Sequence, residues 1–169
     1  NCVASNNGQL GISLHAAAQP HQTTNVHIQA CSVSSNNYRN FNTDHHAGGM
    51  KLILSTNDQD GGGMVVEDCW VVDNNGHGIW LDQLRSNSTP VVIRNNFVKG
   101  NMSLWDQLGY QGHGLFLEIS SNIVVYNNVV VTPITNGGHG ILIFGSDSCR
   151  LFNNTMIHNA TNWQTAGIC

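Results

Sequence analysis

One six-residue segment, Ile123-Val124-Val125-Tyr126-Asn127-Asn128, is repeated with variations along the whole chain. It is an apolar run with strand-like alternation that ends in two small polar residues. A second short apolar run and a loop follow, and the copy closes with a glycine and an aliphatic residue, here Gly140-Ile141. Five copies are present, and a partial one opens the chain. The other segments are Val26–Cys31, Met64–Cys69, Val91–Asn96 and Cys149–Asn154, and the other closing pairs are Gly49-Met50, Gly78-Ile79, Gly114-Leu115 and Gly167-Ile168.

The spacing of the repeats identifies the fold class. The last polar residue of each pair forms a column whose members lie 29, 38, 27, 32 and 26 residues apart (Cys2, Cys31, Cys69, Asn96, Asn128 and Asn154). Repetition at such a period is typical of a solenoid, in which each coil buries its apolar face against the next. The alternation has the period of strands, and no stretch has helical periodicity. The sequence therefore predicts one all-β domain over residues 1–169, a parallel β-helix of about five to six coils stacked ~4.8 Å apart.

The Asn-Asn pairs and the glycine-aliphatic strand starts resemble the repeats of right-handed parallel β-helix proteins. The segments Gly76–Asp82 and Gly114–Ser120 carry the same likeness. This superfamily includes pectate lyases, polygalacturonases, alginate lyases and epimerases, and the likeness covers nearly the whole chain. It implies a right-handed helix with an asparagine ladder at Asn96, Asn128 and Asn154. It does not specify an activity.

Elementary chemistry also supports a ladder in this column. An inward Asn at a tight bend can bond to the backbone and to the Asn of the next coil. In the first coils the column holds cysteine instead, so we expect a small apolar stack there. Cys31 and Cys69 lie on neighbouring coils, at a separation that suits a disulfide, or they are inert core residues.

Composition excludes some classes of function. The formal net charge is −4 with only six Lys and Arg residues, which argues against a nucleic-acid surface. No run of about 18 apolar residues is present, so no membrane span is expected. Four glycosylation sequons, at Asn87, Asn101, Asn153 and Asn159, are compatible with an extracellular or secreted protein, although so Asn-rich a chain can contain them by chance.

The strand phase predicts a candidate catalytic and binding face. Counting from each closing glycine, positions +1 and +3 are aliphatic and should face the core, so +2 and +4 should face outward. The outward positions of three consecutive coils include Lys51, Trp80, Asp82, Phe116 and Glu118. Asp82 and Glu118 should be neighbours that raise each other's pKa, which suits acid–base catalysis or a shared cation. Trp80 and Phe116, if exposed, suit a sugar ring; alternatively, a loop covers Trp80 and the row is structural.

A histidine column precedes the same glycines. His77, His113 and His139 each lie in a Gly-His-Gly triplet and should line up along one edge. They could bind substrate, and His113 could act as the acid or base beside the carboxylates. A row of rings does not converge on a point, so no metal site is predicted from them. The alternative is a tight turn in which each His bonds to a backbone carbonyl.

Motifs of known β-helix enzymes are present only in part. Asn42-Thr43-Asp44 and the Gly-His-Gly triplets resemble polygalacturonase motifs, but the paired aspartates and the Arg-Ile-Lys segment of that family are missing. Lyases of this fold use Lys or Arg as the base, and the candidates here are Lys51, Arg85 and Arg94, with Arg94 expected on a different sheet. Neither signature is complete.

Two insertions and one acidic loop add further candidates. The insertions, Asn36–Gly48 and Asn101–His113, should rise beside the histidine column, and the second offers Trp105 and Tyr110 for substrate binding. The loop at residues 57–63 could bind Ca²⁺ through Asp58 and Asp60, or it is an ordinary bend.

Two functions follow from these patterns. The first is an extracellular β-helix that binds or processes a polysaccharide, by lyase-, hydrolase- or epimerase-like chemistry. The second is a structural module that stacks end to end with further copies. The chain opens within one strand and stops within another, so the sequence predicts a segment of a longer solenoid or coil ends covered by another copy.

Overall fold

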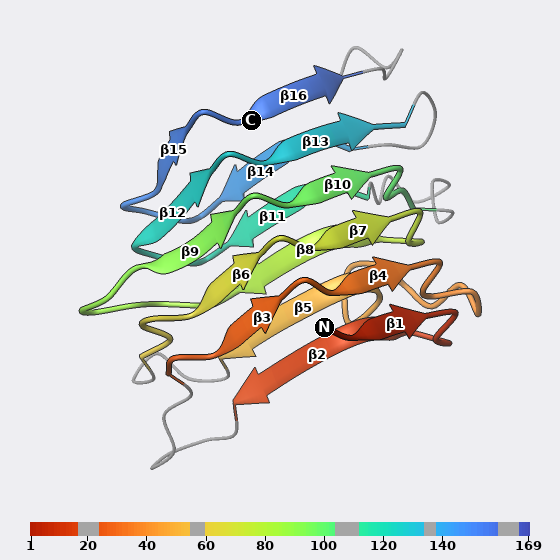
Figure 1. The fold of residues 1–169 in the computed structure, drawn as a ribbon, viewed down its shortest axis with the longest axis horizontal. Coiled ribbons are helices and arrows are strands. Elements are labelled where there is room, and N and C mark those ends of the chain that lie inside the picture. The colour runs from red at the N-terminus through yellow and green to blue at the C-terminus, as the bar shows by residue number, and fades with distance from the viewer. Residues whose placement is uncertain (17–23, 55–59, 104–111, 134–137, 159–165) are drawn as a thin grey trace.

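The computed structural model describes residues 1–16, 24–54, 60–103, 112–133, 138–158 and 166–169. This part of the chain forms sixteen short strands in three sheets (Figure 1). Sheet A contains β1 (Val3–Ser5), β4 (Ser32–Ser34), β7 (Trp70–Val72), β10 (Phe97–Lys99), β13 (Val129–Thr132) and β16 (Thr155–His158). Sheet B contains β2 (Leu10–Ala16), β5 (Gly48–Leu54), β8 (His77–Asp82), β11 (Leu115–Glu118) and β14 (Ile141–Phe144). Sheet C contains β3 (His27–Gln29), β6 (Val65–Glu67), β9 (Val91–Arg94), β12 (Ile123–Tyr126) and β15 (Arg150–Phe152).

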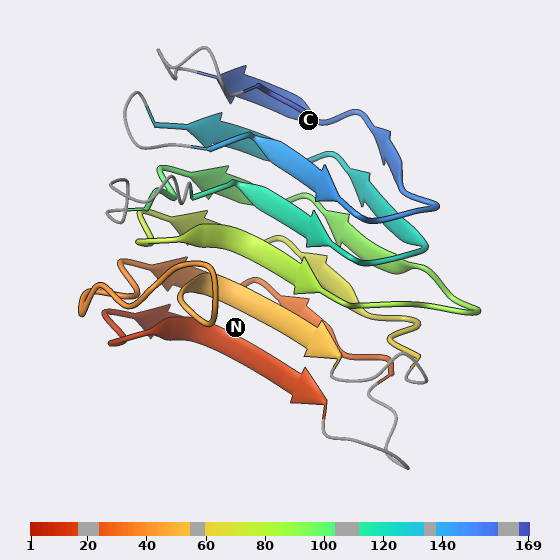
Figure 2. The same cartoon turned by 180° about the vertical axis from the view of Figure 1, so that it is seen from behind.

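The strands follow one another around a solenoid. Strands consecutive in the chain belong to different sheets, and each strand pairs in parallel with its equivalent one coil away. The coils therefore stack in chain order, with sheet B facing the viewer in Figure 2. This confirms the predicted parallel β-helix. Among the described residues there is no helix of the length and apolarity needed to cross a membrane.

The aliphatic positions after each closing glycine form the core, as predicted. Leu115 pairs with Ile79, and Ile79 pairs with Met50, so the same side-chain position repeats from coil to coil. All three side chains are fully buried. Burying each such side chain stabilises the fold by roughly 1.5–3 kcal/mol. Core packing thus sets which residues of sheet B point away from the core.

The polar pair of each copy is a two-residue turn. Asp68, Asn95 and Asn127 have φ angles of 53°, 56° and 55°, in the left-handed region that Asn and Asp tolerate best. Ile119 adopts the same conformation, φ 49°, at a turn that leaves sheet B. A β-branched residue is costly there, which makes this turn a strained one beside the candidate site.

The residue after the left-handed position forms the ladder. The backbone N–H and the side-chain amide of Asn96 both donate to Oδ1 of Asn128, and Asn128 donates in the same way to Oδ1 of Asn154. The predicted asparagine ladder is therefore confirmed. Cys31 and Cys69 carry free thiols, so the disulfide alternative is not formed.

A second asparagine ladder was not predicted. It runs from Asn36 to Asn74 and Asn101, with side chains that are nearly completely buried. Nδ2 of Asn101 also donates to the carbonyl of Val71, so the sequon at Asn101 has no free side chain for a glycan. Each ladder satisfies the backbone groups of a bend that has no strand partner.

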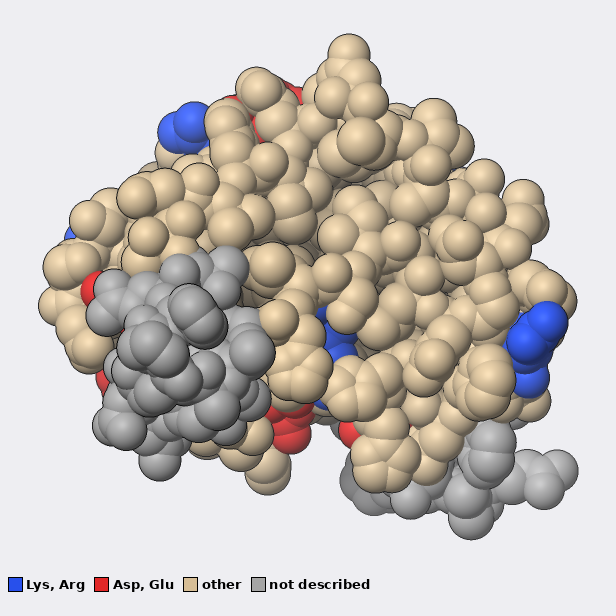
Figure 3. Space-filling view, turned by 90° about the horizontal axis from the view of Figure 1, so that it is seen from below, with Lys and Arg blue, Asp and Glu red and all other residues tan. Residues whose placement is uncertain are grey.

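Charged side chains are sparse on the surface. Only 9% of the residues are charged, and the face in Figure 3 shows Lys, Arg, Asp and Glu side chains at isolated spots in an uncharged surface.

Candidate functional site

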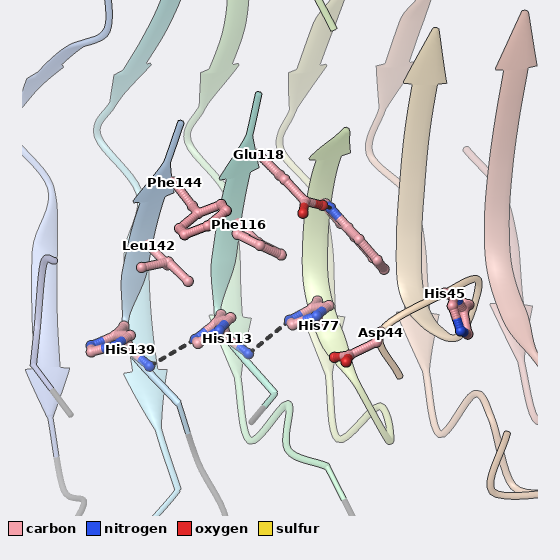
Figure 4. Close-up of a pocket in the computed structure, with 10 residues that line it drawn as sticks. Asp44, His45, His77, His113, Phe116, Glu118, His139, Leu142 and Phe144 are labelled. Atoms are coloured by element: carbon pink, nitrogen blue, oxygen red, sulfur yellow. Dashed lines mark hydrogen bonds between the residues drawn. The ribbon is translucent and has the colours of Figure 1, made fainter. Parts of the chain in front are cut away.

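A pocket of about 530 Å³ lies on the outer side of sheet B (Figure 4). Strands β8, β11 and β14 supply six of the lining residues, His113 and His139 lie just before β11 and β14, and the insertion before β5 supplies Asp44 and His45. The lining residues are Asp44, His45, His77, Trp80, His113, Phe116, Glu118, His139, Leu142 and Phe144.

The strand register brings the predicted face together. Trp80 pairs with Phe116 and Asp82 pairs with Glu118 on the neighbouring strands β8 and β11. Lys51 on β5 pairs with Trp80, so it lies one coil closer to the N-terminus than Trp80. These residues point away from the aliphatic core, as the strand phase predicts.

The expectation that this face is exposed is wrong for most of these residues. The exposed fractions of Lys51, Trp80 and Asp82 are only 3%, 2% and 7%, and Phe116 is also buried. The cause is the insertion between β4 and β5, which crosses the outer side of β5 (Figure 2). Nζ of Lys51 donates to the carbonyl oxygen of His45 in this insertion, 2.5 Å away. Trp80 is buried against Nζ of Lys51, which lies 3.3 Å from its ring centroid, and against the ring of His77.

Lys51 and Asp82 neutralise each other beneath the loop. Their Nζ and Oδ2 atoms are 2.9 Å apart, and Nζ lies 3.3 Å from the centroid of the Trp80 ring. Burial lowers the pKa of Lys51, while the hydrogen bond and charge of Asp82 oppose that shift. Neither side chain lines the pocket. This ion pair therefore anchors the insertion and is not positioned to reach a ligand.

Of the two carboxyl groups predicted for this face, Asp82 and Glu118, only Glu118 lines the pocket. Burial and the nearby charge of Asp82 raise its pKa, and the hydrogen bond from Trp80 and the charge of Lys51 partly offset the rise. Nε1 of Trp80 donates to Oε2 of Glu118 over 3.0 Å and orients the carboxyl group. Asp44, from the insertion, also lines the pocket, and burial raises its pKa. Both carboxyl groups therefore take up a proton more readily than in water.

Apolar side chains form one wall of the pocket. Trp80 and Phe116 stack with their ring centroids 5.4 Å apart. Leu142 continues this row on β14. Phe144, which pairs with Glu118 in the neighbouring row, is 59% exposed and is the accessible aromatic ring of the site. Its position follows from the strand phase, because it occupies the outward +4 position of its coil.

The three histidines stack along the edge of sheet B. Their ring centroids are 5.0 Å apart between His77 and His113, and 5.3 Å apart between His113 and His139. Nδ1 of His77 accepts the backbone N–H of His113, and Nδ1 of His113 accepts that of His139 (Figure 4). The turn alternative had each histidine bonding to a backbone carbonyl, but the bonding partner is a backbone N–H.

Burial keeps these imidazoles neutral. It lowers the pKa of His113 to about 3, with a smaller contribution from His139, and lowers the pKa of His77 well below its usual value. With Nδ1 accepting a hydrogen bond, the proton of a neutral ring lies on Nε2. Neither nitrogen then offers a free lone pair to a metal, and no group of three metal-ligating side chains occurs in the described part of the chain.

The remaining sequence-predicted residues that the structure describes do not line the pocket. Trp105, Tyr110 and Asp58 are outside the described residues. Oδ1 of Asp60 accepts backbone N–H groups of Gly62 and Asn87, the arrangement of an ordinary bend. Of the candidate lyase bases, Arg85 and Arg94 do not line the pocket. Arg94 is on sheet C, as predicted, where it forms an ion pair with Glu67. Arg85 follows β8.

Four pocket residues were not assigned to the site by sequence reasoning. Leu142 and Phe144 lie on β14, one coil beyond the three coils of the predicted face. Asp44 and His45 belong to the insertion before β5, whose Thr43 is buried and hydrogen-bonded to Ser103. The available signals for Asp44 and His45 were the Asn42-Thr43-Asp44 segment and the length of the insertion beside the histidine column. The path that the insertion takes across β5 has no counterpart in the repeat pattern.

Comparison with known proteins agrees with this architecture. The family model described as right-handed beta helix region matches residues 1–160. Searches of curated proteins and of solved structures each returned no match. The match covers nearly all of the coils described above, and this chain therefore belongs to the right-handed β-helix family.

Proposed function

We propose that this protein binds a polysaccharide in the pocket on the outer side of sheet B. One observation carries the proposal: a single groove combines the exposed ring of Phe144 with carboxyl groups and neutral imidazoles. A sugar ring has an apolar C–H face and a rim of hydroxyl groups, so it needs both kinds of contact. A rigid solenoid holds these groups in place before the ligand arrives, which lowers the entropic cost of binding.

Phe144 provides the sharpest test of binding, because it lines the pocket and is exposed. Phe144→Ala should weaken binding of an oligosaccharide by on the order of tenfold, or ~1.4 kcal/mol, through loss of the aromatic platform. Titration calorimetry with oligosaccharides selected on a glycan array measures this effect. The matched control is Phe152→Ala, an exposed phenylalanine on sheet C that does not line the pocket. Equal affinities of Phe144→Ala and the unchanged protein would rule out this pocket.

Processing of the bound polysaccharide is the second candidate function, and the raised pKa of Glu118 favours it. A carboxyl group whose pKa is raised holds its proton to a higher pH than it would in water, which favours a role as general acid toward a glycosidic oxygen. Lys51 and Asp82, predicted as partners in catalysis, are occupied with each other below the pocket surface. Asp44 is the other carboxyl group in the pocket lining.

Glu118→Gln separates processing from binding. Gln retains an acceptor for Nε1 of Trp80 and removes the acidic proton, so the fold and the affinity should stay close to those of the unchanged protein. If Glu118 is the acid, release of reducing ends from the bound polysaccharide should fall by at least about 100-fold. Unchanged turnover in Glu118→Gln would assign the chemistry to another group.

An extracellular location is part of this proposal, since many polysaccharides are found outside cells. The alternative of a non-catalytic module that stacks end to end also stays a prediction. It requires that the protein bind no glycan and that its sedimentation coefficient rise with concentration. Binding by a monomer would favour the first function.

A further inference from the structure

We infer that the histidine column is a fixed row of Nε2–H donors that selects an uncharged glycan chain lying along the coil axis. This inference rests on the proposed function and names the class of ligand. It concerns His77, His113 and His139, whose backbone bonds and pocket positions are described above.

The backbone sets the tautomer of all three rings. Each Nδ1 accepts a backbone N–H, over 3.1 Å at His77, 3.0 Å at His113 and 2.9 Å at His139, where Ala166 is the donor. A nitrogen that accepts a hydrogen bond has no proton, so the proton of the neutral ring is on Nε2. The tautomer is therefore the same on three successive coils.

The Nε2–H groups lack acceptors within the described protein. His77 is 3% exposed and His113 is 8% exposed, yet none of the three Nε2 atoms has a hydrogen-bond acceptor among the residues that the structure describes. Buried donors are paired in the great majority of proteins, and an unpaired one costs about 1–3 kcal/mol. Because the rings line the pocket, a ligand in that pocket can supply the missing acceptors.

The backbone role alone does not require histidine. At the other bends of the coil, asparagine satisfies the neighbouring backbone N–H, as Asn74 does for Asn36. Ser146 does the same for the backbone N–H of Ser120. Imidazole adds a ring and a distal donor. The rings pack against one another, and that of His77 also packs against Trp80 and Phe116, so packing accounts for the ring. Packing does not account for the distal donor, and this donor points to ligand contact as the reason for histidine here.

The charges of the pocket select against acidic sugars. Asp44 and Glu118 are the ionisable residues of its lining besides the histidines, and the described lining contains no Lys or Arg. The nearest cation, Lys51, is already paired with Asp82. A uronate would meet carboxyl groups and no countercharge, whereas hydroxyl and ring oxygens of a neutral sugar can accept from Nε2–H.

The row also sets the direction of the ligand. The donors recur at ring spacings of 5.0 and 5.3 Å along the stack of coils. An extended chain lying along this axis can offer one acceptor to each coil. Affinity should therefore rise with oligomer length until all three donors are used.

A pair of variants at His113 tests the inference. His113→Asn keeps an acceptor near the position of Nδ1 for the N–H of His139 but lacks the distal donor. His113→Gln keeps a distal N–H donor but lacks the acceptor near the backbone. For neutral gluco-, xylo- or manno-oligosaccharides that the unchanged protein binds, His113→Asn should bind roughly tenfold more weakly, and His113→Gln should retain more of the affinity if it folds. Equal affinity of His113→Asn and the unchanged protein would overturn the inference.

Imidazole ¹⁵N NMR of the unchanged protein gives a readout that does not depend on the variants. The expected spectrum shows three neutral rings protonated at Nε2, whose Nε2 resonances shift when a neutral oligosaccharide is added. An Nδ1–H tautomer, or tighter binding of oligogalacturonate than of the neutral oligomers, would overturn the inference and leave the proposed function standing. Failure of the unchanged protein to bind any glycan would instead remove the proposed function, while the tautomers could still be read.

Discussion

Acidification from pH 7 to pH 4 is expected to reduce the free energy of unfolding by roughly 3 kcal/mol through His113 alone. Burial lowers the pKa of His113 in the folded protein from 6.5 to about 3, and it lowers the pKa of His77 well below 6.5. Between these values the unfolded chain binds protons that the folded protein does not. Stability is therefore complete above pH 6.5 and is lost progressively as the pH falls toward 3.

The carboxyl groups of the pocket act in the opposite direction. The pKa values of Glu118 and Asp44 are raised in the folded protein, so these groups bind protons more readily when folded and favour the folded state in acid. They are less buried than His113, which makes their effect smaller. The histidines should therefore dominate the pH dependence.

Urea unfolding followed by circular dichroism at pH 7, 6, 5 and 4 measures this dependence. His113→Asn is the matched control, because it removes the titrating ring and keeps a backbone acceptor. The free energy of unfolding of His113→Asn should decrease less than that of the unchanged protein as the pH falls from 7 to 4. A free energy of unfolding that is constant over this range would contradict the buried, neutral state of the column.

Replacing one ladder asparagine by alanine is expected to lower the free energy of unfolding by about as much as acidification does. Asn74→Ala should lower the free energy of unfolding by about 3–5 kcal/mol, because several buried polar groups lose their partners at once. Oδ1 of Asn74 accepts from the backbone and side chain of Asn36, and Nδ2 donates to the carbonyl of Val33 and to Oδ1 of Asn101.

Asn87→Ala is the control for this prediction. Asn87 is exposed, and its backbone N–H, not its side chain, bonds to Asp60. Its replacement should change stability by less than about 0.5 kcal/mol in the same urea titration. A loss below about 1 kcal/mol for Asn74→Ala would mean that the ladder contributes little beyond the apolar core.

The candidate site was only partly predictable. The strand phase correctly placed Asp82 beside Glu118 and Trp80 beside Phe116, because register in a parallel solenoid follows directly from the repeat. It could not predict that Lys51 and Asp82 are covered, since that depends on where the insertion containing His45 folds back. The second asparagine ladder was missed although Asn36, Asn74 and Asn101 are 38 and 27 residues apart, the same spacings as those of Cys31, Cys69 and Asn96. The repeat therefore contains this ladder too.

Periodicity in the sequence was sufficient for the fold, its coil register and the Asn96–Asn128–Asn154 ladder. Each of these depends on contacts between equivalent positions of neighbouring coils, and equivalent positions can be read from a repeat. The accessibility of the sheet B face, the Lys51–Asp82 pair and the common tautomer of the histidines were decided only in the folded molecule. These features depend on contacts between a non-repeating loop and the coils, or on which backbone N–H meets which ring nitrogen, and no repeat encodes them.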